Sequence, residues 1–218
     1  MQLTAIVMAR ILAFVEVQEL NPQGKAYYPD IVSALVQRFN FQVFPTKPEE
    51  YNEETGILFT DGKFSEGSLE RVQIFTHGIL LDTRIDTDVS DKLLHDTLTW
   101  ARSELGLRYE ENMIKRKAFV SQVTFESEMN FNKLNPVLGN ISNLITSKLR
   151  GSMGQTLNYE PTGVILNLDQ TASKIAPGPF TVERRVELPF TDKKYFSAAP
   201  LSTKDHLAAL KEFEKVLL

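Results

Sequence analysis

Hydrophobic and polar positions change their period several times along the first half of the chain. Ala9–Glu19 is rich in apolar and β-branched residues, which is typical of a strand. Apolar residues at helical spacing over Pro29–Phe39 predict a helix, and proline suits its first turn. A second helix is expected over Ser90–Leu105, capped by Ser90 and ended by Gly106. Between the two helices, short apolar runs predict strands at residues 41–44, 56–60, 69–75 and 79–85.

The second half of the chain shows the same succession of patterns. Ala118–Glu128 alternates as a strand does and places Phe119, Ser121, Val123, Phe125 and Ser127 on one side. Apolar positions at helical spacing follow Pro136, and we expect Gly151–Gly154 to break that helix. Thr203 is expected to cap a final helix that runs to Leu218. Between these helices we expect strands at 156–159, 164–168, 181–188 and 195–198, and a loop at 171–179.

Short sequence matches recur between the halves in the same order. Leu20-Asn21-Pro22 returns 114 residues later as Leu134-Asn135-Pro136. Glu70-Arg71 returns 113 residues later as Glu183-Arg184. The ordered set indicates an internal duplication, while two unrelated modules of the same class remain the alternative.

These patterns predict an α+β protein made of two similar β-α-β-β-β-α halves, with mostly antiparallel sheets and helices on one face. We expect the first half at residues 1–108, a short charged linker at 109–117, and the second half at 118–218. A linker without Gly or Pro favours tight packing, so the halves are expected to form a pseudo-two-fold pair. A groove between them is a common place for a ligand or partner.

Composition excludes several classes of protein. A chain of 218 residues can bury a sizeable core without a disulfide or metal. It contains no cysteine, which excludes disulfides, thiolate metal sites and cysteine nucleophiles, and we expect no cofactor. The net charge of −4 argues against nucleic-acid binding. Contact with nucleic acid through the basic cluster Lys115–Lys117 is kept as a third hypothesis.

The apolar N-terminal stretch Leu3–Val17 fits neither an export signal nor a membrane span. It has no basic start, and Arg10 interrupts it. We therefore expect a cytoplasmic protein that does not enter the membrane. The sequence leaves open whether Met1 or Met8 is the natural start.

One group of residues has the chemistry of a catalytic or metal site. His77 lies at an expected turn, and Asp82, Arg84 and Asp86 follow at alternate positions, on one face of a strand. A histidine with the carboxylates of Asp82 and Asp86 can bind a divalent metal or exchange protons. The favoured alternative is a solvated sheet face on which Arg84 bridges the two carboxylates.

The repeated charged pair supplies candidate contacts to a partner or an anion. Arg71 recurs as Arg184, which Arg185 follows directly. A guanidinium binds carboxylate or phosphate through two hydrogen bonds, so these arginines are the expected contact residues. Ordinary cross-strand salt bridges are the alternative.

The function favoured by the sequence is that of a non-enzymatic interaction protein. There is no phosphate-binding loop, nucleophile elbow or zinc-protease motif. We expect a subunit of a larger protein assembly, either a homo- or a hetero-oligomer. The alternative is a small-ligand-binding protein or metal-dependent hydrolase that uses the groove between the halves, with His77 as the first candidate residue.

Overall fold

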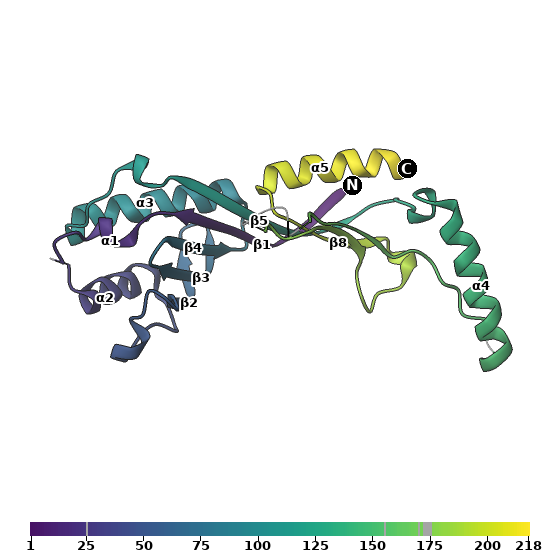
Figure 1. Ribbon diagram of the computed structural model, residues 1–218, viewed down its shortest axis with the longest axis horizontal. Helices are drawn as coiled ribbons and strands as arrows, with labels where there is room; N and C mark the ends of the chain where they lie inside the picture. Colours follow the sequence, from purple (N-terminus) through teal and green to yellow (C-terminus); the bar gives the residue numbers. More distant parts are fainter. Residues whose placement is uncertain (25, 155, 170, 172–175) are drawn as a thin grey trace. The chain divides into compact units, whose positions relative to one another are not determined.

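A computed structural model describes residues 1–24, 26–154, 156–169, 171 and 176–218. In that part of the chain, five α-helices accompany one antiparallel sheet of eight strands, so the α+β class is confirmed (Figure 1). The strand order in the sheet is β2-β3-β4-β1-β5-β8-β7-β6. The strands are β1 (Gln2–Phe14), β2 (Ile57–Phe64), β3 (Gly67–Phe75), β4 (Gly78–Thr83), β5 (Arg116–Glu126), β6 (Gly163–Leu166), β7 (Phe180–Arg184) and β8 (Lys194–Ala199). The helices are α1 (Val17–Leu20), α2 (Tyr28–Phe39), α3 (Thr87–Leu105), α4 (Pro136–Met153) and α5 (Thr203–Leu217).

The chain forms two compact units, to which β1 and β5 both contribute. The N-terminal unit comprises Ile6–Gln122 and Pro200–His206. The C-terminal unit comprises Met1–Ala5, Val123–Ala199 and Leu207–Leu218. The sequence division at 108 and 118 stays a prediction.

Residues 109–117, expected to be a short charged linker, are structured. They contain the short 3-10 turn η2 (Glu111–Met113) and the first two residues of β5. Tyr109 and Met113 are buried in the hydrophobic core of the N-terminal unit. The segment is therefore packed against that unit.

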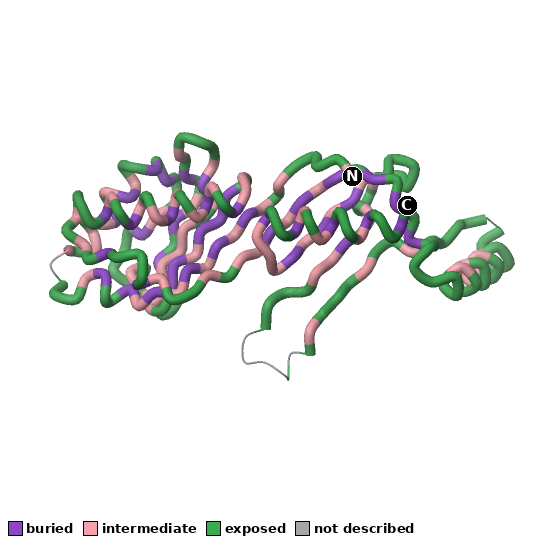
Figure 2. Tube along the Cα trace, turned by 90° about the horizontal axis from the view of Figure 1, so that it is seen from above, coloured by how far each residue is buried: buried purple, intermediate pink, exposed green. Residues whose placement is uncertain are grey.

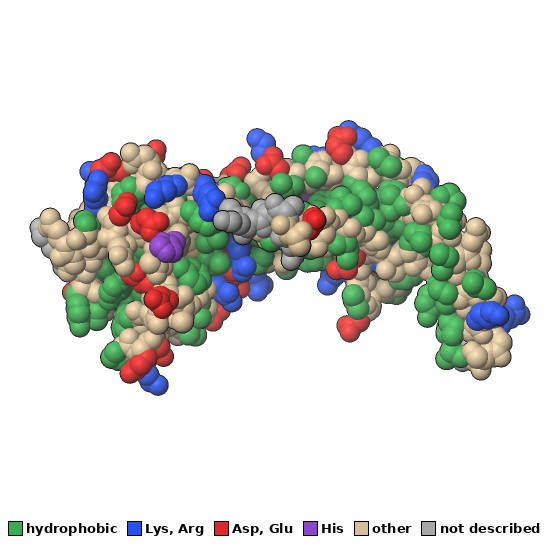
Figure 3. All heavy atoms as spheres, viewed as in Figure 1, with side chains coloured by type: hydrophobic (Ala, Val, Ile, Leu, Met, Phe, Trp, Pro, Cys, Tyr) green, Lys and Arg blue, Asp and Glu red, His purple; other side chains and the backbone are tan. Residues whose placement is uncertain are grey.

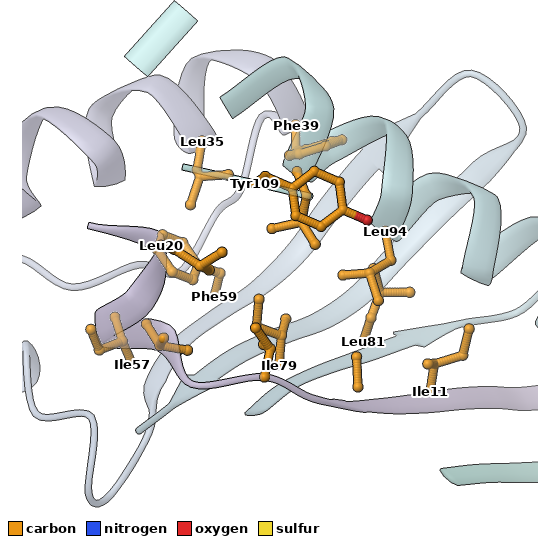
Figure 4. Packing of buried hydrophobic residues seen from close by; sticks show 14 of the residues in the cluster. Ile11, Leu20, Leu35, Phe39, Ile57, Phe59, Ile79, Leu81, Leu94 and Tyr109 are labelled. Carbon is orange, nitrogen blue, oxygen red and sulfur yellow. The ribbon is translucent and has the colours of Figure 1, made fainter. Parts of the chain in front are cut away.

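Helices α2 and α3 cover one face of the sheet in the N-terminal unit. From Ala9 to Ala13 every second residue of β1 is buried, and the register places Ile11 beside Leu81 of β4. Figure 4 shows Leu35 of α2 and Leu94 of α3 packing over these sheet residues. Burying apolar side chains between helices and sheet is the main source of stability in such a layer, at roughly 25 cal/mol per Å² of apolar surface.

The predicted helix ends are partly right. Pro29 lies in the first turn of α2, and Gly106 ends α3 in the left-handed conformation with φ 68°. Ser90 does not cap α3, because the helix begins one turn earlier. Asp86 is the N-cap, and its carboxylate accepts a hydrogen bond of 2.8 Å from the Val89 amide. Ser90 is buried and hydrogen-bonds the Thr83 hydroxyl instead.

Several strands of the first half begin and end at other residues than predicted. The strand predicted over Ala9–Glu19 is the longer β1, which starts at Gln2 and ends at Phe14. Val17–Leu20 turns into α1, because this places both of its apolar ends in the core. The segment 41–44 makes only an isolated bridge between Val43 and Thr60. The pair β3 and β4 forms a hairpin, with an irregularity between Leu69 and Arg71.

The alternation predicted within Ala118–Glu128 is confirmed for β5, although this strand begins two residues earlier, at Arg116, and ends two residues earlier, at Glu126. Val123 and Phe125 are buried on one face, and every second residue of β8 is buried as well (Figure 2). The Phe125 ring stacks on Tyr195 at 5.5 Å, and Phe131 contacts both Tyr195 and Phe213 of α5. These rings form the core of the C-terminal unit between the sheet and α5.

Four predictions for the second half are corrected. Helix α4 continues through Gly151 to Met153 and ends at Gly154, which has φ 67°. Residues 156–159 form no strand, and β7 ends at Arg184 rather than at 188. Ser202 caps α5 by accepting a hydrogen bond from the Asp205 amide, while Thr203 exchanges hydrogen bonds with Thr87. Part of the loop predicted at 171–179 lies outside the described residues.

Candidate functional site

His77 lies in the turn between β3 and β4, as predicted, but its partner is Glu16. The Nδ1 atom of His77 is 2.6 Å from Oε2 of Glu16, which lies just before α1. The His77 side chain is 76% exposed. The contact is therefore a surface pair, which contributes little to stability.

Asp82 is buried between two arginines on the neighbouring strands. Nε and Nη2 of Arg10 donate to its two carboxylate oxygens at 2.7 and 2.8 Å. Nε of Arg71 lies 3.9 Å from the same carboxylate. The hydrogen bond to Asp82 raises the pKa of the Arg10 guanidinium. Asp82 thus serves as the centre of a cross-strand ion cluster.

The structure does not bring His77, Asp82 and Asp86 together. His77 precedes β4 and Asp86 follows it, so the six-residue strand separates them by about 20 Å at ~3.3 Å per residue. Because β4 ends at Thr83, the expected alternation does not reach Asp86, and Arg84 pairs with Glu70 instead of bridging two aspartates. Among the described residues, no three His, Cys, Asp or Glu side chains are placed to hold a metal ion.

The three candidate arginines lie in different surroundings. Arg71 is exposed on β3 beside Asp82. Arg184 is only 12% exposed: it lies over the rings of Phe190 and Tyr195 and donates to the Phe190 carbonyl at 3.0 Å. Arg185 is exposed just after β7. Arg184 also pairs with Glu160 at 3.5 Å, so it is held by rings, a carbonyl and a carboxylate, whereas Arg71 and Arg185 are accessible.

A polar network that sequence reasoning missed ties β5 to α3. Nζ of Lys117 donates to Asp91 at 2.8 Å and lies 2.9 Å from Nε2 of His95. The other ring nitrogen of His95 contacts the Tyr109 hydroxyl. Burial raises the pKa of that hydroxyl. Lys117, part of the basic cluster Lys115–Lys117, is thus held in place by this network.

An apolar cavity of about 90 Å³ lies in the N-terminal unit. Its walls come from α2, α3 and the helix-facing side of β3 and β4, including Leu35, Leu98 and Val72. Asn21, Tyr28 and Thr97 are the lining residues that have polar side-chain groups, and the lining is otherwise apolar. Such a cavity is suited to an apolar molecule of very few carbon atoms.

The most unusual surface of the protein is the apolar side of α4. All residues of this helix are described, and none of them is buried. Figure 3 shows hydrophobic side chains gathered along the helix. We call this surface the α4 apolar face, formed by the exposed residues Val137, Leu138, Ile141, Leu144 and Met153.

The α4 apolar face has the spacing of a helix side that packs against a core. Val137, Ile141 and Leu144 of this face follow one another at intervals of four and three residues. In α2, Val32, Leu35 and Phe39 have the same spacing, and all are buried. The sequence therefore indicated which side of α4 is apolar, but periodicity does not reveal what covers it.

The strand β6 also exposes apolar side chains. It is the last strand of the sheet, and Ile165 and Leu166 are 70% and 60% exposed. We call these two residues the β6 edge. An unpaired strand edge with apolar side chains favours association with another chain.

No family model matches this sequence, and no curated protein matches it significantly either. No described helix is long and apolar enough to cross a membrane.

Proposed function

We propose that this protein is a non-enzymatic interaction protein that works as a subunit of a larger assembly, either a homo- or a hetero-oligomer. The observation that carries the proposal is the α4 apolar face. Five large apolar side chains on one helix are exposed, with Leu144 at 57%. Exposed apolar patches of this kind typically mark surfaces that bind a partner.

The β6 edge supports the same conclusion. It belongs to the C-terminal unit, as does α4. A strand edge recruits a partner through its free backbone groups, and a helix face does so through apolar side chains. The C-terminal unit thus has two kinds of binding surface, and we assign the interaction to this unit. Arg71 and Arg185, which are accessible, remain candidate polar contacts.

We further propose that the chain arose by internal duplication. Apart from the short helix α1, which has no α-helical counterpart among the described residues of the second half, the elements β1, α2, β2, β3, β4 and α3 are followed by β5, α4, β6, β7, β8 and α5 in the same succession of types. The strand order is mirrored as well, since β2-β3-β4-β1 is followed by β5-β8-β7-β6. A duplicated module in which the two first strands pair would give this order. The halves 1–108 and 118–218 would then be copies of one module and form the pseudo-two-fold pair.

Native mass spectrometry of the protein, purified gently from its own host, tests the proposed function. We expect masses that correspond to several copies of the 24.7 kDa chain or to this chain with another protein. A mass of 24.7 kDa alone at every concentration, with α4 intact, would contradict the proposal. A cytoplasmic location remains part of the proposal, and fractionation of host cells tests it.

A second candidate function rests on the cavity of the N-terminal unit. Its volume of about 90 Å³ and its apolar lining suit a small apolar molecule. Methyl resonances of Leu35 and Leu98 should then shift when xenon is added under pressure, because xenon enters dry apolar cavities. Shifts no larger than those of exposed methyl groups would exclude ligand binding here. A metal-dependent hydrolase is not proposed, because His77, Asp82 and Asp86 lie apart.

A further inference from the structure

The sheet of the N-terminal unit has a second face, opposite to the one that α2 and α3 cover. Ile11 and Leu81 point toward the helices (Figure 4), so their neighbours along β1 and β4 point to the other side. All side chains on that side except Asp82 are exposed or half-buried. We call it the open sheet face; the registers of the four strands place on it Arg10, Leu12, Phe14, Leu58, Thr60, Arg71, Gln73, Phe75, Leu80 and Asp82.

Two arginines flank one carboxylate on the open sheet face. In the register, Asp82 of β4 lies between Arg10 of β1 and Arg71 of β3. Arg10 donates to both carboxylate oxygens, whereas Nε of Arg71 stays 3.9 Å away. Among the described residues, Arg71 makes no hydrogen bond through its guanidinium, and its side chain is 44% exposed. Asp82 therefore engages one guanidinium fully, and the donors of Arg71 are available to an external anion.

The basic cluster Lys115–Lys117 divides between the two faces of the sheet. Lys117 is bound to Asp91 of α3, on the side of the helices. Arg116 belongs to the opposite side, where its guanidinium lies 4.3 Å from the centre of the Phe14 ring. Arg116 is exposed at this position, so the cluster adds a third arginine to the open sheet face.

The open sheet face is positively charged in a protein that is acidic as a whole. Arg10, Arg71 and Arg116 outnumber its one carboxylate, Asp82, and leave two positive charges on it. The whole chain has a net charge of −4. Local charge, rather than the net charge of the chain, decides where a polyanion is attracted.

Carboxylates at the margins of this face have partners of their own. Glu16 pairs with His77, and Glu70 pairs with Arg84. Glu50, near the β2 margin, accepts hydrogen bonds from two backbone amides. The positive charge is therefore confined to the strip that crosses β3, β4, β1 and β5.

Two phenylalanine rings lie on the same face. Phe14 follows Arg10 on β1, and Phe75 follows Arg71 on β3, in both cases by four residues or about 13 Å. At the level of Phe75, β4 has Gly78, which carries no side chain. The rings thus have room beside them for a flat group.

We propose that the open sheet face binds a single strand of nucleic acid, with phosphates at the three arginines and bases on the rings of Phe14 and Phe75. Guanidinium groups bind phosphate through two hydrogen bonds, and unpaired bases stack on aromatic rings and guanidinium planes. The combination of rings and cations on one face favours a nucleic-acid strand over an acidic peptide, which would use the cations alone. This inference goes beyond the proposed function, which rests on the C-terminal unit.

Fluorescence anisotropy of a labelled oligothymidylate of about 12 nucleotides, mixed with the full chain at low salt, tests the assignment. We expect a dissociation constant of roughly 10 µM, and a slope of about 2 for log Kd against log salt, because each neutralised phosphate of a single strand contributes ~0.7. The variant Arg71→Ala/Arg116→Ala should bind at least tenfold more weakly, with a slope below about 1. The matched control Lys92→Ala/Lys211→Ala removes two exposed positive charges from α3 and α5 and should bind like the wild type.

Phe75→Leu separates stacking from charge. The variant keeps an apolar side chain but lacks the ring, so binding should weaken at least fivefold with the salt slope unchanged. A duplex of the same length hides the faces of its bases and should compete at least tenfold less well than the single strand. Urea midpoints show which variants keep the fold, and the two substitutions at the exposed Arg71 and Arg116 are expected to leave it unchanged.

Several results would overturn the inference. It is refuted if the oligonucleotide does not bind at protein concentrations up to about 100 µM at low salt, or if both double variants lose the same affinity. Displacement of the oligonucleotide by an equal concentration of polyglutamate would assign the face to an acidic protein partner instead. Equal competition by the duplex, with Phe75→Leu binding like the wild type, would refute the stacking of bases on the rings. The proposed assembly is unaffected by these results, because native mass spectrometry tests it separately.

Discussion

His206 should make the stability of the protein fall steeply in mild acid. The residue lies in the first turn of α5 and is completely buried, and its amide donates to the Ser202 carbonyl at 2.8 Å. Burial penalises the charged imidazolium and lowers the pKa of His206 from 6.5 to about 4. In the unfolded chain the imidazole is exposed and titrates near 6.5.

The sign follows from which state binds the proton. Between pH 6.5 and 4 the unfolded state is protonated at this site and the native state is not, so stability falls as pH falls through this window. The free energy of unfolding therefore falls by about 3 kcal/mol between pH 7.5 and 4, since each unit of difference between the pKa values of the two states corresponds to ~1.4 kcal/mol. Below pH 4 the native imidazole is protonated too, and the loss levels off.

Urea denaturation at a series of pH values measures this effect, with His206→Gln as the control for all other titrating groups. Between pH 7.5 and 4, the free energy of unfolding of the wild type should fall by about 3 kcal/mol more than that of the variant. The imidazole resonances should titrate near pH 4 in the folded protein. A difference in free energy below about 1 kcal/mol, or an imidazole that titrates near 6.5 in the native state, would refute the reasoning.

Three further predictions concern single side chains, each measured by urea denaturation at pH 7. Arg10→Ala removes the guanidinium that donates two hydrogen bonds to the buried Asp82 carboxylate, and should lower the free energy of unfolding by about 3 kcal/mol. His77→Ala removes only a surface pair and should lower it by less than about 0.5 kcal/mol. Asp86→Ala removes the N-cap of α3 and should cost about 1 kcal/mol, with Asp86→Ser restoring most of it. Arg184→Ala removes the cation stacked on Phe190 and should cost about 2 kcal/mol, and an unchanged midpoint would show that this arginine is not part of the packing.

The secondary structure was predictable wherever one face of an element is buried. Alternation in β5 and helical spacing in α2 both reflect contact with a core, and the structure confirms both. Helix ends were less predictable, because both Asp86 and Ser90 are suitable caps. The structure shows that the helix starts before Ser90, because the Asp86 carboxylate accepts from the Val89 amide, while the Ser90 hydroxyl is bonded to Thr83.

The candidate site was harder to predict for a different reason. Asp82 was a candidate catalytic carboxylate beside the favoured interpretation of a solvated sheet face, and the sequence does not show that Arg10, 72 residues away on the neighbouring strand, pairs with it. The amphipathic pattern of α4 was visible, but a pattern identifies an apolar side without identifying what covers it. Whether that side meets the chain's own core or another chain is decided by tertiary structure.

Hydrogen exchange of the α4 amides tests the central claim most directly. In the assembly, a covered α4 apolar face should protect the amides of residues 140–153 at least a hundredfold more than in the Ile141→Asp/Leu144→Asp variant. The amides of α2, which is packed in the N-terminal unit, serve as the internal reference and should be protected equally in both proteins. Equal exchange of α4 in the wild type and the variant would contradict the account, because it would show that nothing binds this helix.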